Sequence, residues 1–117
     1  MRTTVSIGLP GTTPAATIAA LAPRIERLGY RSLWLNDVPN GDSLAGLRTA
    51  ASATSTLELA TGAIPLDRRP AASLDLSDLP VERTAIGVAS GASRHPLALV
   101  GDGVAMLRQT TDAAIVV

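Results

Sequence analysis

The chain has 117 residues, of which 46% are hydrophobic and 17% charged, which is typical of one folded domain rather than a disordered segment. Ten arginines balance ten acidic residues without a run of one sign, and one Trp and one Tyr offer little for stacking on bases, so we expect no nucleic-acid partner. The chain has no Cys and one His, which excludes disulfides, thiolate metal sites and multi-His metal sites.

The N-terminal segment only faintly resembles a secretory signal peptide. Gly8, Pro10, Gly11 and Pro14 interrupt the apolar region that such a peptide needs. No stretch of the chain approaches the ~20 apolar residues of a membrane span. We therefore expect a cytoplasmic protein that has no membrane partner.

Five short apolar segments are typical of β-strands. Their first residues lie 26 to 29 positions apart, a period that accommodates one strand and one crossover helix. The segments are Thr4 to Leu9, Arg31 to Asn36, Leu57 to Ile64, Thr84 to Ser90 and Ala113 to Val117.

In most of the intervals between these strands, apolar residues recur with helical periodicity. In the first interval, apolar residues recur at helical spacing from Ile18 to Leu28, with Thr13 as the predicted N-cap. Pro23 predicts a kink in this helix or a later start. Further helices are predicted from Ser43 and from Pro96.

The third interval is the weakest of the four, because the leucines of residues 70–80 fit no single period and predict only a short helix. Strands that are apolar on both faces, such as Ser32 to Leu35, indicate a parallel sheet covered by helices, so the fold class is α/β. Periodicity alone leaves two architectures open, a doubly wound sheet of the flavodoxin type and the first half of a (β/α)8 TIM-type barrel.

In either architecture ligands bind at the carboxyl ends of the strands, where this chain has mostly small and polar residues. Asp37 is the only acid directly at a strand end, so it is a candidate to orient a ligand or accept a proton, with capping of a turn as an equal alternative. Arg68 and Arg69 are candidates for a phosphate, but the adjacent Asp67 favours a solvated ion pair.

Three segments resemble the luciferase-like monooxygenase superfamily, whose members use FMN or the 5-deazaflavin coenzyme on a (β/α)8 barrel. They are Leu28 to Asp37, with its Gly-Tyr-Arg-Ser-Leu-Trp run, Thr61 to Pro70, and Ile86 to Gly91. Two positions depart from the family pattern. Val38 stands where the family often has His, and Ala89 occupies a usual Gly position.

The resemblance implies an incomplete, all-parallel TIM-type barrel of about four βα units plus a fifth strand, with residues 1–117 as a single domain, the N-terminal half. It implies a flavin- or deazaflavin-dependent oxidoreductase with a small organic substrate, FMN or the deazaflavin coenzyme as cofactor, and no metal. A non-prolyl cis peptide that supports the flavin ring in the family would fall near Gly62 and Ala63. The implied catalytic residue is Asp37, and the implied cofactor-binding residues are Asn36, Thr61, Gly62, Ala63, Ser90 and Gly91.

The family's phosphate-binding loops belong to the second half of the barrel, which these residues do not include. Two alternative functions therefore stay open. The first is a catalytically silent fragment or assembly subunit, with a homodimer or a complementing chain covering the open edge strands. The second is a flavodoxin-like FMN-binding module.

Overall fold

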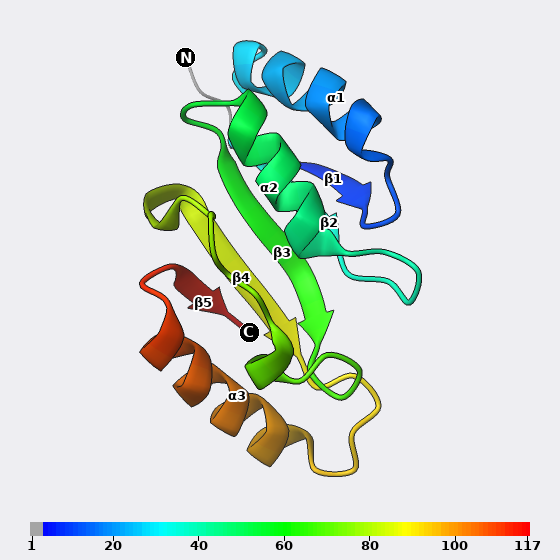
Figure 1. Cartoon of the computed structure of the whole chain (residues 1–117), viewed down its shortest axis with the longest axis vertical. Coiled ribbons are helices and arrows are strands. Elements are labelled where there is room, and N and C mark those ends of the chain that lie inside the picture. The colour runs from blue at the N-terminus through cyan, green and yellow to red at the C-terminus, as the bar shows by residue number, and fades with distance from the viewer. Residues whose placement is uncertain (1–3) are drawn as a thin grey trace.

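Five parallel strands form one sheet in the chain order β1-β2-β3-β4-β5 (Figure 1). The computed structural model describes residues 4–117. Consecutive strands are neighbours throughout, as in a TIM-type barrel, whereas a flavodoxin-like sheet places β1 between β2 and β3. The fold is therefore α/β and matches part of a TIM-type barrel. The elements are β1 (Ile7–Pro10), α1 (Ala15–Arg27), β2 (Ser32–Asn36), α2 (Ser43–Ala53), β3 (Glu58–Pro65), η1 (Ala71–Ser73), η2 (Val81–Arg83), β4 (Thr84–Ala89), α3 (Pro96–Thr110) and β5 (Ala114–Val116).

The helices lie on one face of the sheet, as right-handed crossovers between consecutive parallel strands require (Figure 1). Alternate strand residues point to this face and pack against the apolar stripes of α1 and α2. The other face has no helical cover. The largest fully buried side chains are Ile18, Leu33, Leu35, Leu44, Leu47, Leu57, Leu59, Ile64, Leu66, Ile86, Leu107 and Val88.

The predicted strands and helices correspond to observed elements, with differences at their ends. The N-cap of α1 is Pro14 and not Thr13, because the Thr13 hydroxyl donates to the Pro10 carbonyl at 2.6 Å and stabilises the preceding turn instead. Helix α1 continues through Pro23, so the later start is not observed. Helix α2 begins at Ser43 as predicted, with Asp42 as its N-cap accepting from two backbone amides.

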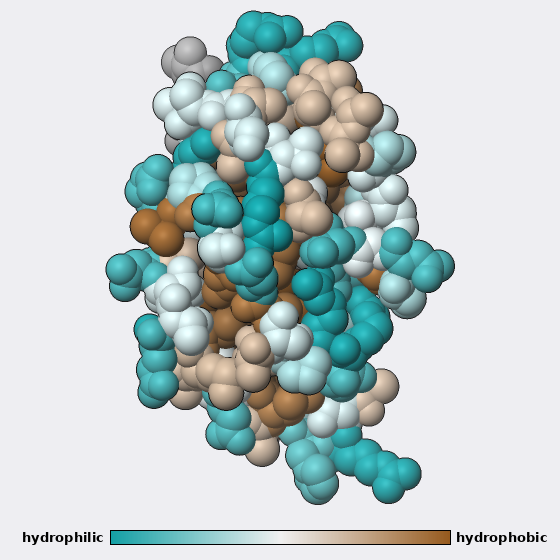
Figure 2. Space-filling model, viewed as in Figure 1, coloured by the Kyte–Doolittle hydropathy of each residue, from teal (hydrophilic) through white to brown (hydrophobic). Residues whose placement is uncertain are grey.

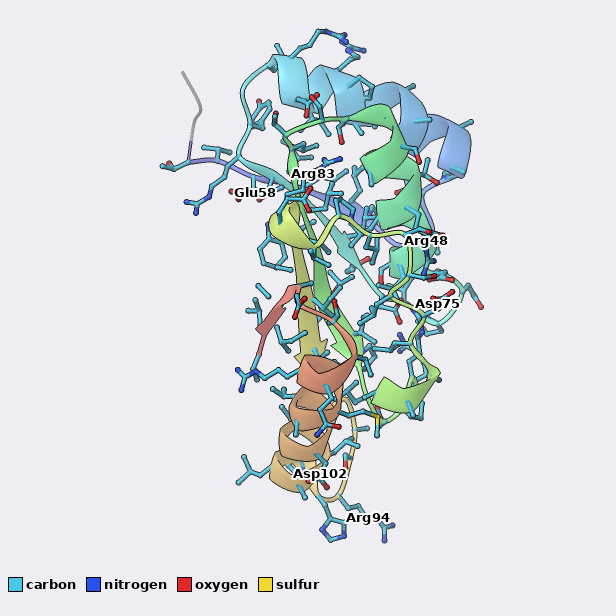
Figure 3. The ribbon with its side chains drawn as sticks, turned by 60° about the vertical axis from the view of Figure 1, so that its left-hand side comes forward. Arg48, Glu58, Asp75, Arg83, Arg94 and Asp102 are labelled. Atoms are coloured by element: carbon cyan, nitrogen blue, oxygen red, sulfur yellow. The ribbon has the colours of Figure 1, made fainter. Side chains whose placement is uncertain are left out.

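The short helix expected in the third interval is a single 3-10 turn, η1, and the interval, which also holds the 3-10 helix η2 before β4, contains no α-helix. Pro70 and Pro80 bracket a mostly extended segment, whose leucines pack on the core without helical spacing. Arg48 of α2 holds the segment in place by donating to the carbonyls of Ser77, at 3.1 Å, and Asp75 (Figure 3). Figure 2 shows apolar residues at the centre of the helix-covered side of the molecule, between α2 and α3.

One carboxylate organises the connection between α2 and β3 at the amino end of the sheet. Glu26 of α1 accepts hydrogen bonds from the backbone amides of Ser55, Thr56 and Leu57, at 2.7 to 3.3 Å. Burial raises the pKa of Glu26, but these amide hydrogen bonds outweigh that effect and hold the pKa below its ordinary value. The ionised carboxylate therefore stabilises the fold.

Among residues 4–117, no helix is both long enough and apolar enough to span a membrane. The same residues contain no group of three or more His, Asp or Glu side chains placed to hold a metal ion.

We predict that Glu26→Gln lowers the free energy of unfolding by about 1–3 kcal/mol at pH 7, because an amide oxygen is a weaker acceptor than a carboxylate. The pKa of Glu26 is lowered in the folded state, so its stabilisation is present above the ordinary value of 4.5 and is lost as the pH falls through the folded value. The difference between variant and parent, measured by urea unfolding, should therefore shrink below pH 4. Glu82→Gln, at an exposed position, is the matched control.

Candidate functional site

The carboxyl end of β2 lies beside that of β3, since Leu35 is the register partner of Thr61. Asn36 ends β2, and its side-chain oxygen accepts the amide of Gly11 at 2.9 Å, which fixes the loop after β1. Within residues 4–117 no group accepts from the Asn36 amide nitrogen, and the residue is exposed. Asn36 therefore presents a hydrogen-bond donor at the rim of the sheet.

Next to Asn36 lie Gly62 and Ala63 of strand β3, whose side chains are absent or a single methyl group, so the backbone is accessible there. The Gly62–Ala63 peptide bond is cis and non-prolyl, as the resemblance predicted for this position. The register between β3 and β4 shifts between Thr61 and Ile64, so this segment departs from the regular ladder. Gly62 is exposed and Ala63 half-buried, and the Trp34 ring covers only the side of Gly62 on which a Cβ would lie, so a planar group can approach the backbone from the remaining exposed side.

Thr61 does not reach the surface of the rim. Its side chain is fully buried, and its hydroxyl donates to the Gly87 carbonyl at 3.0 Å and accepts from the Gly87 amide at 2.9 Å. A Cβ at Gly87 would lie 2.2 Å from the Thr61 carbonyl oxygen, so only glycine fits there. Thr61 thus aligns β3 with β4, and any effect on a ligand passes through the backbone.

Ser90 and Gly91 lie farther along the rim than Gly62, because Ala89 pairs with Pro65. Gly91 has a φ of 64°, and a Cβ there would collide with the carboxylate of Asp67. That carboxylate accepts the Ala92 amide at 2.8 Å. The predicted residues therefore form two groups, one at Asn36, Gly62 and Ala63 and one at Ser90 and Gly91.

The carboxylate of Asp37 lies beneath the rim, with its side chain 0% exposed. One oxygen accepts from the Ser43 amide at 3.2 Å, the Ser43 hydroxyl at 2.9 Å and Arg69 at 2.6 Å. The other accepts from Arg68 at 3.2 Å, and Arg68 also donates to the Asp37 carbonyl at 2.8 Å. We call Asp37, Ser43, Arg68 and Arg69 the Asp37 cluster.

Burial raises the pKa of Asp37, but the Ser43 hydrogen bonds and the charge of Arg69 outweigh it and hold the pKa below its ordinary value. The carboxylate is therefore ionised and fully occupied by protein donors. In this geometry it ties the loop after β2 to the turn after β3.

The expectation of a solvated ion pair between Asp67 and its neighbouring arginines is wrong. Arg68 and Arg69 turn toward Asp37 because its carboxylate is buried and needs donors, whereas Asp67 is engaged by Ala92. Sequence proximity favoured the wrong partner. The parallel register could have indicated the right one, since it brings the loops after β2 and β3 together.

Sequence reasoning also missed Trp34, on the sheet face that the helices leave uncovered. Its indole nitrogen donates to the Ser32 hydroxyl at 2.9 Å, and that hydroxyl is 2.6 Å from the Ser6 hydroxyl. A Cβ at Gly62 would lie 2.6 Å from the Trp34 ring, so ring and rim are in contact. Alternation within β2 could have revealed this, since Ser32, Trp34 and Asn36 share one face.

The strands of this parallel sheet follow one another in chain order, the helices cover one face, and the carboxyl ends carry small and polar residues. These features define the chain as an α/β domain of the TIM-barrel type, in which the carboxyl ends of the strands form the ligand-binding rim. The family model described as luciferase-like monooxygenase matches residues 2–115, and the chain belongs to this family.

Among solved structures the chain is similar to the coenzyme F420 dependent tetrahydromethanopterin reductase from Methanopyrus kandleri. The two share 23% sequence identity with a TM-score of 0.62, and the match covers 86% of this chain and 30% of the reductase. At this identity the likeness concerns the fold, and the chain spans less than a third of the reductase. No curated protein matches the chain.

We predict that Asp37→Ala lowers the free energy of unfolding by about 3 kcal/mol, because it leaves two arginines and the Ser43 amide without their shared acceptor. Urea unfolding at pH 7 measures the loss. Asp102→Ala, at an exposed position of α3, removes a carboxylate without such partners and should change stability by less than about 0.5 kcal/mol. Equal effects of the two substitutions would contradict the role of the cluster.

We further predict that Gly62→Ala displaces the Trp34 ring, because the added methyl group has no space, and lowers stability by about 1–3 kcal/mol. Trp34 is the only tryptophan, so its emission spectrum reports the displacement directly. Gly8→Ala is the matched control, since Gly8 is the register partner of Trp34 and a Cβ there meets nothing within 4 Å. An unchanged Trp34 spectrum in Gly62→Ala would exclude the contact.

Proposed function

We propose that this chain supplies the strand-end rim of a flavin- or deazaflavin-dependent oxidoreductase of the luciferase-like type. Family membership supports an oxidoreductase-type domain, and the similar reductase is named for coenzyme F420. The observation that carries the proposal is the exposed, nearly side-chain-free Gly62–Ala63 segment beside the donor of Asn36. A flat ring with carbonyl and nitrogen acceptors along its edge suits this combination of surface and donor.

Each rim residue then has a distinct part in holding the ring. The Asn36 amide donates to an acceptor on the ring edge, while Gly62 and Ala63 let the ring approach the backbone. Ser90 and Gly91 lie farther out along the rim, and Thr61 keeps β3 aligned with β4. The cofactor, when bound, supplies the hydride or oxygen chemistry acting on a small organic substrate.

Asp37 acts in this proposal through its neighbours. Its carboxylate holds Arg68 and Arg69 and thereby fixes the turn that follows Gly62 and Ala63. Asp37 orients both arginines and offsets part of their charge, so we expect the rim to recognise the ring rather than a phosphate. FMN and the deazaflavin coenzyme should therefore be distinguished here only by their rings.

A second candidate function is an assembly subunit, favoured by the two edge strands β1 and β5, each of which has a single neighbour in the sheet. Another copy or a complementing chain would pair with these edges and cover the exposed Val116. Light scattering after size exclusion tests this candidate. A stable monomer at micromolar concentration would count against it.

Riboflavin, which has the flavin ring without the phosphate, tests the proposal most directly. We expect riboflavin and FMN to bind with affinities within about threefold of each other, because the rim contacts the ring alone. Asn36→Asp keeps the acceptor for the Gly11 amide but removes the NH2 donor, and should weaken riboflavin binding by about fivefold or more.

Quenching of riboflavin fluorescence gives both affinities, with Asn40→Asp in the neighbouring loop as the matched control. Failure of riboflavin, FMN and the deazaflavin coenzyme alike to bind would refute the proposed function. Unchanged binding in Asn36→Asp would refute the assigned donor.

A further inference from the structure

One register row across the uncovered face of the sheet combines a single large aromatic residue with four very small ones. Gly8 pairs with Trp34, Trp34 with Ala60, Ala60 with Ala85, and Ala85 with Ala114. Bulky branched residues dominate the corresponding interior layers of TIM barrels. This row therefore leaves an unusual space beside the Trp34 ring.

The space is a hollow of about 460 Å³, here called the concave hollow. It lies toward the amino ends of β2, β3 and β4, at the opposite end of the strands from Asn36 and Ser90. Trp34, Ala60, Ala85 and Ala114 are among its lining residues. Its volume falls in the range of about 300–1,000 Å³ that small-molecule pockets occupy.

The Trp34 ring is held in place as one wall of the concave hollow. Its nitrogen is bonded to Ser32, its six-membered ring contacts the backbone at Gly62, and 36% of the residue is exposed. A ring fixed at both ends loses little conformational entropy when a second ring packs on it. Trp34 is thus a preorganised stacking surface.

The charged groups around the concave hollow disfavour an anionic ligand. Arg31 pairs with Glu58 at 3.4 Å, and Arg83 donates to four oxygen atoms of the α2–β3 segment. Figure 3 shows Glu58 and Arg83 together at this end of the sheet. Glu82 adds a further acidic residue to the lining.

The Thr84 hydroxyl does not face the concave hollow. It is buried without a hydrogen-bond partner within residues 4–117, and Thr84 is in register with Leu59 on the helix-covered side of the sheet. The arginines around the concave hollow are therefore engaged, and the Trp34 ring is its main binding surface.

We propose that the concave hollow binds a neutral, planar aromatic molecule of about two fused rings, stacked on Trp34. This site adjoins the rim at Trp34 but extends toward the opposite ends of the strands, and it does not depend on flavin binding at the rim. The ring lies along the Ala60, Ala85 and Ala114 row, where each additional side-chain carbon would occupy the space that the ligand needs.

The test uses 2-methyl-1,4-naphthoquinone, a neutral two-ring molecule that quenches tryptophan fluorescence. Trp34 is the only tryptophan, and the chain has no Cys to react with the quinone. We expect saturable quenching of Trp34, whereas N-acetyltryptophanamide shows only the linear dependence of collisional quenching. Linear quenching in the protein as well would overturn the proposal.

Ala85→Leu fills the concave hollow without removing the fluorophore, and we expect it to weaken quinone binding about tenfold or more. Ala98→Leu, at an exposed position of α3, adds the same atoms elsewhere and should leave binding unchanged. Ala114→Leu, on the exposed edge strand β5, should weaken quinone binding as Ala85→Leu does. It replaces Ala85→Leu in the test if circular dichroism shows that Ala85→Leu is unfolded. Undiminished binding in the filled variants would overturn the proposal.

Asn36→Asp separates this site from the rim. The substitution should leave quinone quenching unchanged while weakening riboflavin binding, because Asn36 lies at the other end of the strands. Loss of quinone quenching in Asn36→Asp would place the aromatic ring at the rim and overturn a separate site. Failure of flavin binding alone would refute the proposed function and leave the concave hollow intact.

Discussion

The rim of this domain depends on the carboxylate of Asp37 and the donors that surround it. A buried charge is tolerated only where hydrogen bonds and opposite charges compensate its lost hydration. Ser43 supplies two of those bonds from the start of α2, and Arg68 and Arg69 supply the others from the turn after β3. Two loops that are far apart in sequence thus share one electrostatic centre, and Asn36 and Gly62 lie on the strands that those loops extend.

The uncovered face of the sheet is organised differently, by the size of its side chains rather than by charge. Small residues flank Trp34 on both sides, and the ring is positioned by one hydrogen bond and by contact with Gly62. Because Gly62 belongs to the rim and also contacts the ring, a change at this residue affects both regions. The domain therefore has two adjoining surfaces of different chemistry.

Much of the fold followed from the sequence because strand spacing and helical periodicity are local properties. The start of the helix at Ser43 was predicted to the residue, and the strand over Thr84 to Ala89 almost so. The third connection was not, because its leucines pack individually in extended chain and Arg48 replaces helical hydrogen bonds with side-chain contacts. The choice between sheet orders came from resemblance and was confirmed by the strand order.

The candidate site was less predictable, since its contacts join residues about 30 positions apart. Residue type and position placed Asp37 at the end of β2, but not the enclosure of its carboxylate by Arg69, which required the neighbouring loop. Trp34 was overlooked because the apolar character of β2 concealed an alternation of buried and exposed side chains. In both cases the missing information was the face on which a side chain lies or the partner that it contacts. The pairing between strands determines both.

At the opposite end of the sheet, the short segment between α2 and β3 has the appearance of an ordinary surface loop. Surface loops commonly tolerate inserted residues and exchange of their sequence. Here Glu26 binds three consecutive amides, and Arg83 binds carbonyls of the same stretch. One added residue would shift the groups on one side of the insertion away from their partners, so this loop can vary in side chains but not in length.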